Sequence, residues 1–218
     1  MPLPPSEPPA PATCDMSPLL TSLAQRGEER RYRKDTLLIQ EGDVGDTLYI
    51  ILKGRLRAYT TGDKDRELTY GTYGPGEYIG EMSLDGGPRS ASVVTLEAST
   101  CVVVTRTTLR AFIAEHPDFA FELLSKVIRR ARAASLNAKQ MALNDAYGRL
   151  AALLNDLARL LADGTPFVAG PLTHLDMAQR VGCSREMVSR LMKDLQRGGY
   201  IDADRRGIRL LKPLPQRW

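Results

Sequence analysis

Cysteines are few in this chain, and long apolar runs do not occur. The three cysteines, Cys14, Cys101 and Cys183, are odd in number, lie far apart and form no CxxC pair. This spacing argues against a disulfide framework and against a zinc site. No segment approaches the roughly eighteen consecutive apolar residues that a membrane span needs. We therefore expect a cytoplasmic protein, in a reducing compartment, that has no membrane partner.

The first residues also lack an export signal. The opening stretch MPLPPSEPPAPATCD has no basic region followed by an apolar core. It is rich in proline and has no large apolar side chain after Leu3. Such a composition buries too little apolar surface to fold, so we expect a disordered proline-rich tail over residues 1–16.

Sequence patterns of common catalytic sites are missing as well. The chain contains no GxSxG, no P-loop, no HExxH and no cysteine with a nearby histidine pattern. Its two histidines are His116, in the helix-start motif EHPD, and His174, inside a predicted helix, and we expect ordinary structural roles for both. Cys14 stands alone in the tail and offers no cysteine cluster for iron. We expect no enzyme and no bound metal, haem or iron–sulfur cluster.

The charges that are present are unevenly placed. The hydrophobic content of 43% and the charged content of 26% are near the globular average, and 218 residues suffice for one large or two small domains. A net charge of +4 is too small to indicate a polyanionic partner by itself. The C-terminal end nevertheless carries a basic excess, in Arg205, Arg206, Arg209, Lys212 and Arg217.

Short β-type runs fill the segment from Arg30 to about Thr108. The runs TLYIILKG, ASVVTLEA and TCVVVTR are rich in β-branched residues, and glycine-bearing turns interrupt them at regular intervals. Evenly spaced short strands of this kind predict a β-sandwich or a β-roll.

A long helix is predicted after the EHPD motif. Pro117 suits a first helical turn, and the next thirty residues contain no glycine or proline. Apolar and small residues recur in alternating steps of four and three, the period of a two-stranded coiled coil. The narrow seam favours a homodimer, with packing inside one chain as the alternative. The seam comprises Ala120, Leu124, Val127, Ala131, Ala134, Ala138 and Met141.

Further helices and a hairpin are predicted toward the C-terminus. The stretch AYGRLAALLNDLARLLADG predicts an amphipathic helix with leucines on one face as far as Leu161 and Gly164 as its stop. Two short helical patterns follow, and then YIDADRRGIRLL, which predicts a hairpin that turns near Arg206 and Gly207. Strands, a seam helix and a compact helical end predict an α+β fold.

The stretch LTHLDMAQRVGCSREMVSRLMKDLQRGGYI predicts a helix-turn-helix. Thr173 and Asp176 can form a capping box, Gly182 supplies the turn, and Ser184 can cap the second helix. A recognition helix places its N-terminal side chains against base edges, where arginine can bind guanine and glutamate can accept from cytosine. Solvated charges on a surface helix are the alternative. The predicted DNA-binding residues are Ser184, Arg185, Glu186, Ser189 and Arg190, with Arg205, Arg206 and Arg209 as backbone contacts.

Two motifs carry a resemblance to a known family. GEMSLDGGPRSAS, from Gly80 to Ser92, and VGCSREMVSRLMKDL occur in the order typical of the bacterial catabolite activator and fumarate-nitrate regulator (Crp/Fnr) superfamily, over about residues 17–212. The resemblance implies a β-roll (double-stranded β-helix or jelly roll) effector domain over 17–117 and a dimerisation helix over 118–145. It further implies a winged helix-turn-helix over 146–218, double-stranded DNA and a second copy as partners, and a contact with RNA polymerase.

The resemblance also implies a nucleotide effector. A cyclic nucleotide has a phosphodiester anion and a ribose hydroxyl, so it needs a guanidinium with backbone amides and a carboxylate acceptor. In this assignment Arg89 and Ser90 hold the phosphate, Glu81 accepts from the ribose, and Gly80 lets the backbone approach. The alternative is a turn whose arginine makes a surface ion pair. The implied effector residues are Gly80, Glu81, Met82, Arg89, Ser90 and Ser135.

Two departures from the catabolite activator leave the effector open. The stretch from Glu81 to Arg89 is shorter, and Ala134 with Ser135 stands where cAMP-responsive members use a Thr-Ser pair. Losing one such hydroxyl can weaken discrimination by about 1–3 kcal/mol. We expect cAMP, with c-di-GMP or no ligand as alternatives. A regulatory module of a partner enzyme or channel is the alternative from another functional class.

The recognition helix is closer to the family pattern. CSREMVSR resembles that of the catabolite activator, with Arg185, Glu186 and Arg190 in the base-reading places. The resemblance implies a palindromic target built from TGTGA-like half-sites one helical turn apart. An effector held between Arg89 and Ser135 would favour one register of the dimer helix and so set the spacing of the two recognition helices.

Overall fold

The computed structural model describes residues 16–62 and 66–215, apart from the side chains of residues 140–143. All but Met16 of the predicted tail lies outside the described residues. The chain divides into two compact units. The first unit consists of Met1–Arg57 and Thr72–Phe121, and the second consists of Ala58–Gly71 and Glu122–Trp218.

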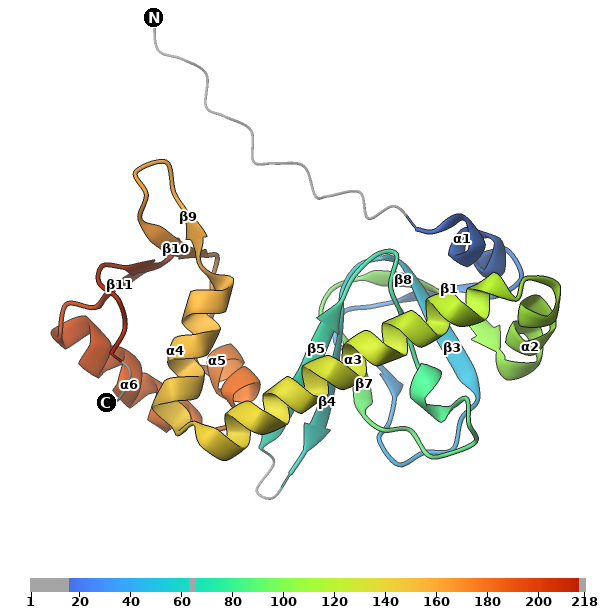
Figure 1. Ribbon diagram of the computed structural model, residues 1–218, viewed down its shortest axis with the longest axis horizontal. Coiled ribbons are helices and arrows are strands. Elements are labelled where there is room, and N and C mark those ends of the chain that lie inside the picture. Colours follow the sequence, from blue (N-terminus) through green and yellow to red (C-terminus); the bar gives the residue numbers. More distant parts are fainter. Residues whose placement is uncertain (1–15, 63–65, 216–218) are drawn as a thin grey trace, which may run out of the picture. The chain divides into compact units, whose positions relative to one another are not determined.

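Eight strands form two four-stranded sheets in the N-terminal part of the chain (Figure 1). The strand orders are β1-β8-β3-β6 and β2-β7-β4-β5, so the chain passes repeatedly from one sheet to the other. This is the strand order of a jelly roll, which confirms the predicted roll. The strands are β1 (Glu28–Tyr32), β2 (Leu37–Ile39), β3 (Thr47–Lys53), β4 (Leu56–Thr61), β5 (Glu67–Tyr73), β6 (Tyr78–Ile79), β7 (Ser92–Thr95) and β8 (Ser99–Thr105).

Alternating side chains of the roll build its core. In β3, Leu48 and Ile50 are completely buried while Thr47 and Tyr49 are partly exposed, and Ile51 breaks the alternation because it is completely buried as well. Val104 of β8 pairs with Leu48. Each such side chain contributes about 1.5–3 kcal/mol of burial free energy. Two helices, α1 (Pro18–Ala24) and α2 (Arg106–Glu115), contact β8. The roll therefore has a packed hydrophobic core that can support the predicted effector segment from Gly80 to Ser92.

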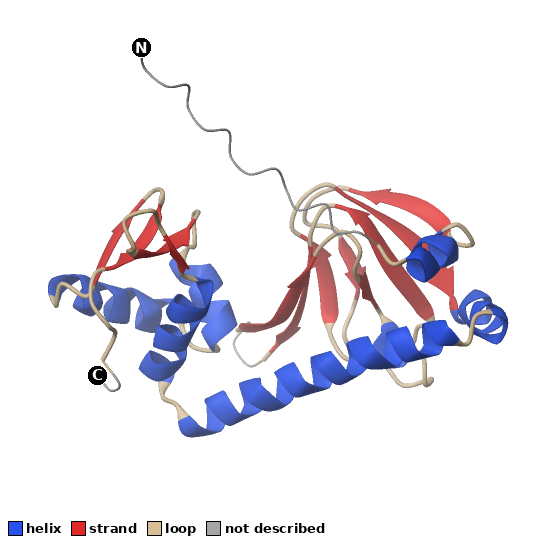
Figure 2. Cartoon of the chain, turned by 45° about the horizontal axis from the view of Figure 1, so that its top comes forward, coloured by secondary structure: helices blue, strands red, loops and turns tan. Residues whose placement is uncertain are grey.

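The helix α3 (Asp118–Leu143) is continuous over 26 residues (Figure 2). It exposes large apolar side chains, including Phe121 at 71% and Leu124 at 53% of their surface. Among the predicted seam residues that follow Leu124, Val127 is half-buried, and the seam alanines 131, 134 and 138 are exposed. The side chain of the last, Met141, lies outside the described residues. The dimer interface stays a prediction.

The C-terminal elements combine three helices with a four-stranded sheet. The sheet order is β11-β12-β10-β9, and the helices α5 and α6 pack against each other. The elements are α4 (Ala146–Leu157), β9 (Arg159–Leu160), β10 (Pro166–Ala169), α5 (His174–Val181), α6 (Arg185–Arg197), β11 (Ile201–Asp204) and β12 (Gly207–Leu210). Below, residues 146–210 are called the winged-helix region, and residues 201–210 the wing.

The predicted end of α4 is wrong. The helix ends at Leu157, and the backbone of Ala158 is extended, with φ −67° and ψ 140°. Arg159 and Leu160 then pair with Phe167 and Pro166 across the sheet. Strand pairing thus overrides the helical pattern that the sequence continues as far as Gly164.

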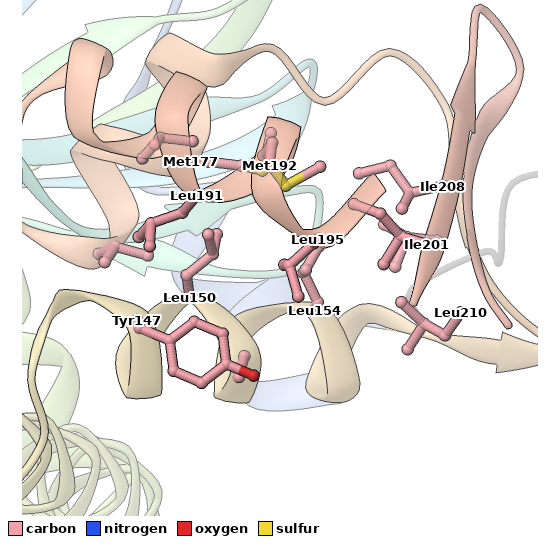
Figure 3. Close-up of a cluster of buried hydrophobic side chains, with 14 of the residues drawn as sticks. Tyr147, Leu150, Leu154, Met177, Leu191, Met192, Leu195, Ile201, Ile208 and Leu210 are labelled. Atoms are coloured by element: carbon pink, nitrogen blue, oxygen red, sulfur yellow. The ribbon is translucent and has the colours of Figure 1, made fainter. Parts of the chain in front are cut away.

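A single apolar core holds the winged-helix region together (Figure 3). Tyr147, Leu150 and Leu154 of α4 belong to one buried cluster with Leu195 of α6, and Ile208 joins it from the wing. The α+β fold is confirmed by this arrangement together with the roll. Among the described residues, no helix is both long enough and apolar enough to cross a membrane.

Candidate effector site and candidate DNA-reading surface

The predicted effector segment begins at a glycine that no other residue can replace without strain. Gly80 follows β6 with φ 92°, in the left-handed region, and precedes a short 3₁₀ helix, η2 (Glu81–Ser83). A Cβ atom here would lie 2.6 Å from the carbonyl oxygen of Thr47 and 2.9 Å from Nη1 of Arg89. The glycine therefore allows both the turn and the close approach of the arginine.

The guanidinium of Arg89 is buried within a set of oxygen acceptors. The residue is only 7% exposed. Its Nη1 donates to the carbonyl oxygens of Thr47 and Gly80, each at 3.0 Å, and to Oγ of Ser83 at 2.8 Å. Its Nη2 donates to Oγ1 of Thr47 at 2.8 Å. Each of these acceptors is neutral, so the cation is held by dipoles.

The backbone of Arg89 is fixed as well. Its N–H donates to Asp43 O at 2.8 Å, and its carbonyl accepts from the N–H of Gly42 at 2.9 Å. A Cβ atom on Gly45 would lie 2.8 Å from both Nε and Nη2 of Arg89. The loop before β3 thus approaches the guanidinium at Nε and Nη2, whereas Gly80 approaches it at Nη1.

The other predicted effector residues differ in position. Glu81 is buried, whereas Met82 and Ser90 are exposed. Ser135 belongs to the second unit, on α3, where its hydroxyl donates to the carbonyl of Ala131 at 3.0 Å. The structure brings Gly80 and Arg89 into contact and leaves the role of Ser135 a prediction.

Three residues of the arginine site were missed in the sequence. Thr47 and Gly45 lie more than forty positions before Arg89, and Ser83 lies six positions before it. Ser83 stood inside the singled-out motif, and its hydroxyl was the only signal that could have marked it. Nothing in the sequence links Thr47 or Gly45 to Arg89, because the link is made by the folding of the roll.

The helix-turn-helix forms as its capping residues predict. The side chain of Thr173 accepts from the N–H of Asp176 while Asp176 accepts from the N–H of Thr173, which completes a capping box. Gly182 ends α5 in the left-handed region, with φ 70°, and Ser184 caps α6 by accepting from the N–H of Met187 at 3.2 Å. These sequence predictions are confirmed.

One face of α6 is exposed and charged, and the other is buried. Arg185, Glu186 and Arg190 are exposed, whereas Val188 and Leu191 are buried in the core. The next predicted reading residue, Ser189, is half-buried, and its Oγ lies 2.8 Å from Nδ1 of His174 on α5. The helix N-terminus, with the cap residue Ser184, is therefore available to a partner that enters from that face.

The wing presents two arginines at its turn. Asp204 accepts from the N–H of Arg206 at 2.7 Å and of Gly207 at 3.1 Å, and it forms an ion pair with the Arg206 guanidinium. The N–H of Arg206 above all, and then its guanidinium, hold the pKa of Asp204 below its ordinary value. Arg205 is exposed beside this pair, and Arg209 lies 3.9 Å from Asp163.

In the described part of the chain, the cysteines and the other side chains that could bind a metal form no cluster. Burial raises the pKa of the Cys101 thiol to about 11, so it stays protonated at neutral pH. Burial also raises the pKa of Cys183. Within the described ranges, no group of three or more His, Cys, Asp or Glu side chains could hold a metal ion.

Family models match both parts of this architecture. Residues 29–116 match the cyclic nucleotide-binding domain, and residues 148–214 match the Crp-like helix-turn-helix domain. The first match contains the arginine site, and the second contains α5, α6 and the wing.

Curated relatives and a solved structure agree with these matches. The chain is 33% identical to a CRP-like cAMP-activated global transcriptional regulator of Mycobacterium tuberculosis, over 77% of either chain. It is 34% identical to the cyclic AMP receptor protein of Thermus thermophilus, over 80% of this chain and 79% of the relative. The structure of the c-di-GMP-responsive regulator CLP of Xanthomonas campestris shares the fold with a TM-score of 0.78 at 24% identity, over 89% of this chain and 98% of CLP.

Regulators of this family bind DNA and are typically dimers. The matched relatives are transcriptional regulators and not enzymes. The chain belongs to the Crp/Fnr superfamily and is a Crp-like transcriptional regulator with a cyclic nucleotide-binding domain and a helix-turn-helix.

Proposed function

We propose that this chain is a homodimeric, sequence-specific DNA-binding regulator whose effector is cAMP. The buried guanidinium of Arg89 is the observation that carries the effector proposal. A buried cation that is held only by neutral oxygens gains from an anion placed beside it, because charge-assisted hydrogen bonds are roughly twice as strong as neutral ones. The phosphodiester of a cyclic nucleotide supplies such an anion.

The remaining effector residues complete a nucleotide site in this proposal. Glu81 accepts from the ribose hydroxyl, and Ser90 joins Arg89 at the phosphate. Gly80 and Met82 border the ligand, and Ser135 contacts the base from α3. The curated relatives support cAMP, since those from Mycobacterium tuberculosis and Thermus thermophilus are named for cAMP.

Calorimetry of the full chain tests the effector. We expect cAMP to bind in preference to cGMP and c-di-GMP, and we expect Arg89→Ala to abolish that binding. Arg110→Ala is the matched control, because Arg110 is an exposed arginine on α2 of the same unit. Binding of c-di-GMP alone would replace cAMP as the effector, and binding of none of the three would support a ligand-free regulator.

The DNA side of the proposal rests on the exposed N-terminus of α6. Arg185, Glu186 and Arg190 read bases in the major groove, Ser184 and Ser189 flank them, and the wing arginines 205, 206 and 209 contact phosphates. Two copies of α6 in a two-fold dimer would read TGTGA-like half-sites one helical turn apart. RNA polymerase is the proposed further partner at a promoter.

Comparing the palindrome with non-specific duplexes separates base reading by α6 from simple attraction between charges. Arg185→Ala is expected to lower the affinity for the palindrome by about tenfold or more while non-specific binding changes little. Equal loss on all duplexes would contradict base reading. A chain that binds cAMP but no duplex would be a regulatory module of a partner protein.

A further inference from the structure

A hydrogen bond joins the two helices of the helix-turn-helix at their exposed side. Nδ1 of His174, the first residue of α5, lies 2.8 Å from Oγ of Ser189 on α6. Ser189 follows Arg185 by four positions and Glu186 by three, so helical geometry places it on their face. The histidine thus reaches the proposed reading face without belonging to the reading helix.

The chemistry of the two side chains makes this bond selective. A serine hydroxyl can donate or accept, and it rotates to suit its partner. If Nδ1 of His174 accepts the Ser189 proton, the hydroxyl offers only lone pairs and suits an amino group of adenine or cytosine. If Nδ1–H donates, the serine proton is free for a base acceptor. In the first tautomer the histidine removes the serine donor, and in the second it occupies one lone pair of the serine oxygen and directs the serine proton away from the imidazole.

We propose that His174 is a positioning residue for DNA reading, which fixes the Ser189 hydroxyl so that it discriminates at one base pair of each half-site. This inference rests on the proposed DNA-reading function. It concerns duplex DNA only and needs no further ligand.

A purely structural role fits the surroundings of His174 less well. His174 is exposed and does not belong to the buried cluster of the winged-helix region. The first turn of α5 is capped by Thr173 and Asp176, so the helix start does not depend on the imidazole. His174 also lines a cavity of about 320 Å³ with Arg205 of the wing. The side chain therefore lies where the two helices and the wing meet, on the proposed DNA side.

Selection of binding sites from random duplexes by the full chain tests the proposal. The wild type is expected to select a palindromic motif. His174→Ala and Ser189→Ala are each expected to lose about fivefold to tenfold of the preference at the same single position of the half-site, as for one hydrogen bond. The double variant should lose no more than either single variant. His174→Asn, which keeps an amide near the place of Nδ1, should restore part of the preference.

The matched control is Leu175→Ala, an exposed apolar residue on the same turn of α5. It is expected to keep the wild-type motif. An unchanged motif in His174→Ala or in Ser189→Ala, additive losses in the double variant, or the same loss in Leu175→Ala would each overturn the proposal. If His174→Ala does not fold, Ser189→Ala and His174→Asn test the same hydrogen bond. A wild type that selects no motif would instead contradict the proposed function.

Discussion

At the scale of single residues, neutral oxygen acceptors and two glycines hold the buried guanidinium of Arg89 in a fixed position. Arg89 keeps its guanidinium inside the roll because Thr47, Gly80 and Ser83 supply oxygen acceptors and two glycines leave room. A preformed donor needs less ordering on binding, and preorganisation of this kind raises affinity. On binding the proposed phosphate, the guanidinium of Arg89 would exchange some of its neutral acceptors for a charged one.

Gly80→Ala tests the close approach at this site. A Cβ atom would meet the carbonyl of Thr47 and Nη1 of Arg89, and the left-handed backbone would be strained. We expect cAMP affinity to fall by tenfold or more, about 1.4 kcal/mol, in calorimetry.

The control for this prediction is Gly86→Ala. Gly86 also has a positive φ, of 100°, but the nearest atom to its Cβ position is 3.9 Å away. It should share the backbone strain without the clash, so it should keep most of the affinity. Equal loss in both variants would show that backbone strain, and not the displacement of Arg89, decides binding.

Some residues around Arg89 were predictable from the sequence, and others were not. Gly80 and Arg89 stand nine positions apart in one motif, so a local pattern could predict them together. Thr47 and Gly45 act on Arg89 only because the start of β3 and the loop before it lie beside the segment from Gly80 to Ser92 in the folded roll. The bond between His174 and Ser189 was out of reach for the same reason, since it depends on how α5 crosses α6.

At the scale of elements, the caps of α5 and α6 were predicted from the sequence, whereas α1 and α2, which begin at the caps Ser17 and Thr105, were not predicted. Thr173, Asp176, Gly182 and Ser184 carry their signals locally, and each behaves as its residue type predicts. The end of α4 was missed because its stop is not local. Arg159 and Leu160 pair with β10 instead of continuing the helix, and no residue type near Leu157 predicts that pairing.

The wing turn makes a prediction at this scale. Asp204 holds the turn through the N–H groups of Arg206 and Gly207. Asp204→Ala should loosen the turn and weaken binding to every duplex alike, because the wing arginines are proposed to contact phosphates. Fluorescence anisotropy on the selected palindrome and on a random duplex measures this effect.

The charge of Asp204 adds a pH dependence of known sign. Its pKa is lowered in the folded protein, so its stabilisation of the turn is complete above the ordinary aspartate pKa and is lost as pH falls through the folded value. The turn should therefore be fully formed at neutral pH. Asp204→Asn, which keeps an oxygen acceptor, should stay closer to the wild type than Asp204→Ala. A selective loss on the palindrome alone would contradict the phosphate role.

At the scale of the whole molecule, α3 is proposed to pair two copies of the chain. Phe121, Leu124 and Ile128 expose large apolar surfaces at spacings of three and four along this helix. Soluble proteins rarely leave such a stripe uncovered. Leu124→Glu should therefore shift the protein toward monomers in sedimentation.

The same variant should weaken binding to the palindrome much more than binding to a single half-site, because only a dimer contacts both halves. Ser125→Glu is the matched control, since Ser125 is exposed on the same turn of α3 and outside the predicted seam. A Leu124→Glu protein that stays dimeric would contradict this interface. A monomeric Ser125→Glu protein would show that added charge on this turn is sufficient to separate the copies.

We propose that an effector held at Arg89 controls DNA reading by α6. Linkage requires that a ligand which raises DNA affinity also binds more tightly when DNA is present. The effector therefore acts only through its difference in affinity between the two states of the dimer.

The most direct measurement is a titration of the palindromic duplex by anisotropy at fixed salt, with and without saturating cAMP, for the wild type and Arg89→Ala. We predict that cAMP raises the affinity of the wild type by at least fivefold, about 1 kcal/mol of coupling, and leaves Arg89→Ala unchanged. Equal wild-type affinities with and without cAMP, or an equal rise in Arg89→Ala, would contradict the account.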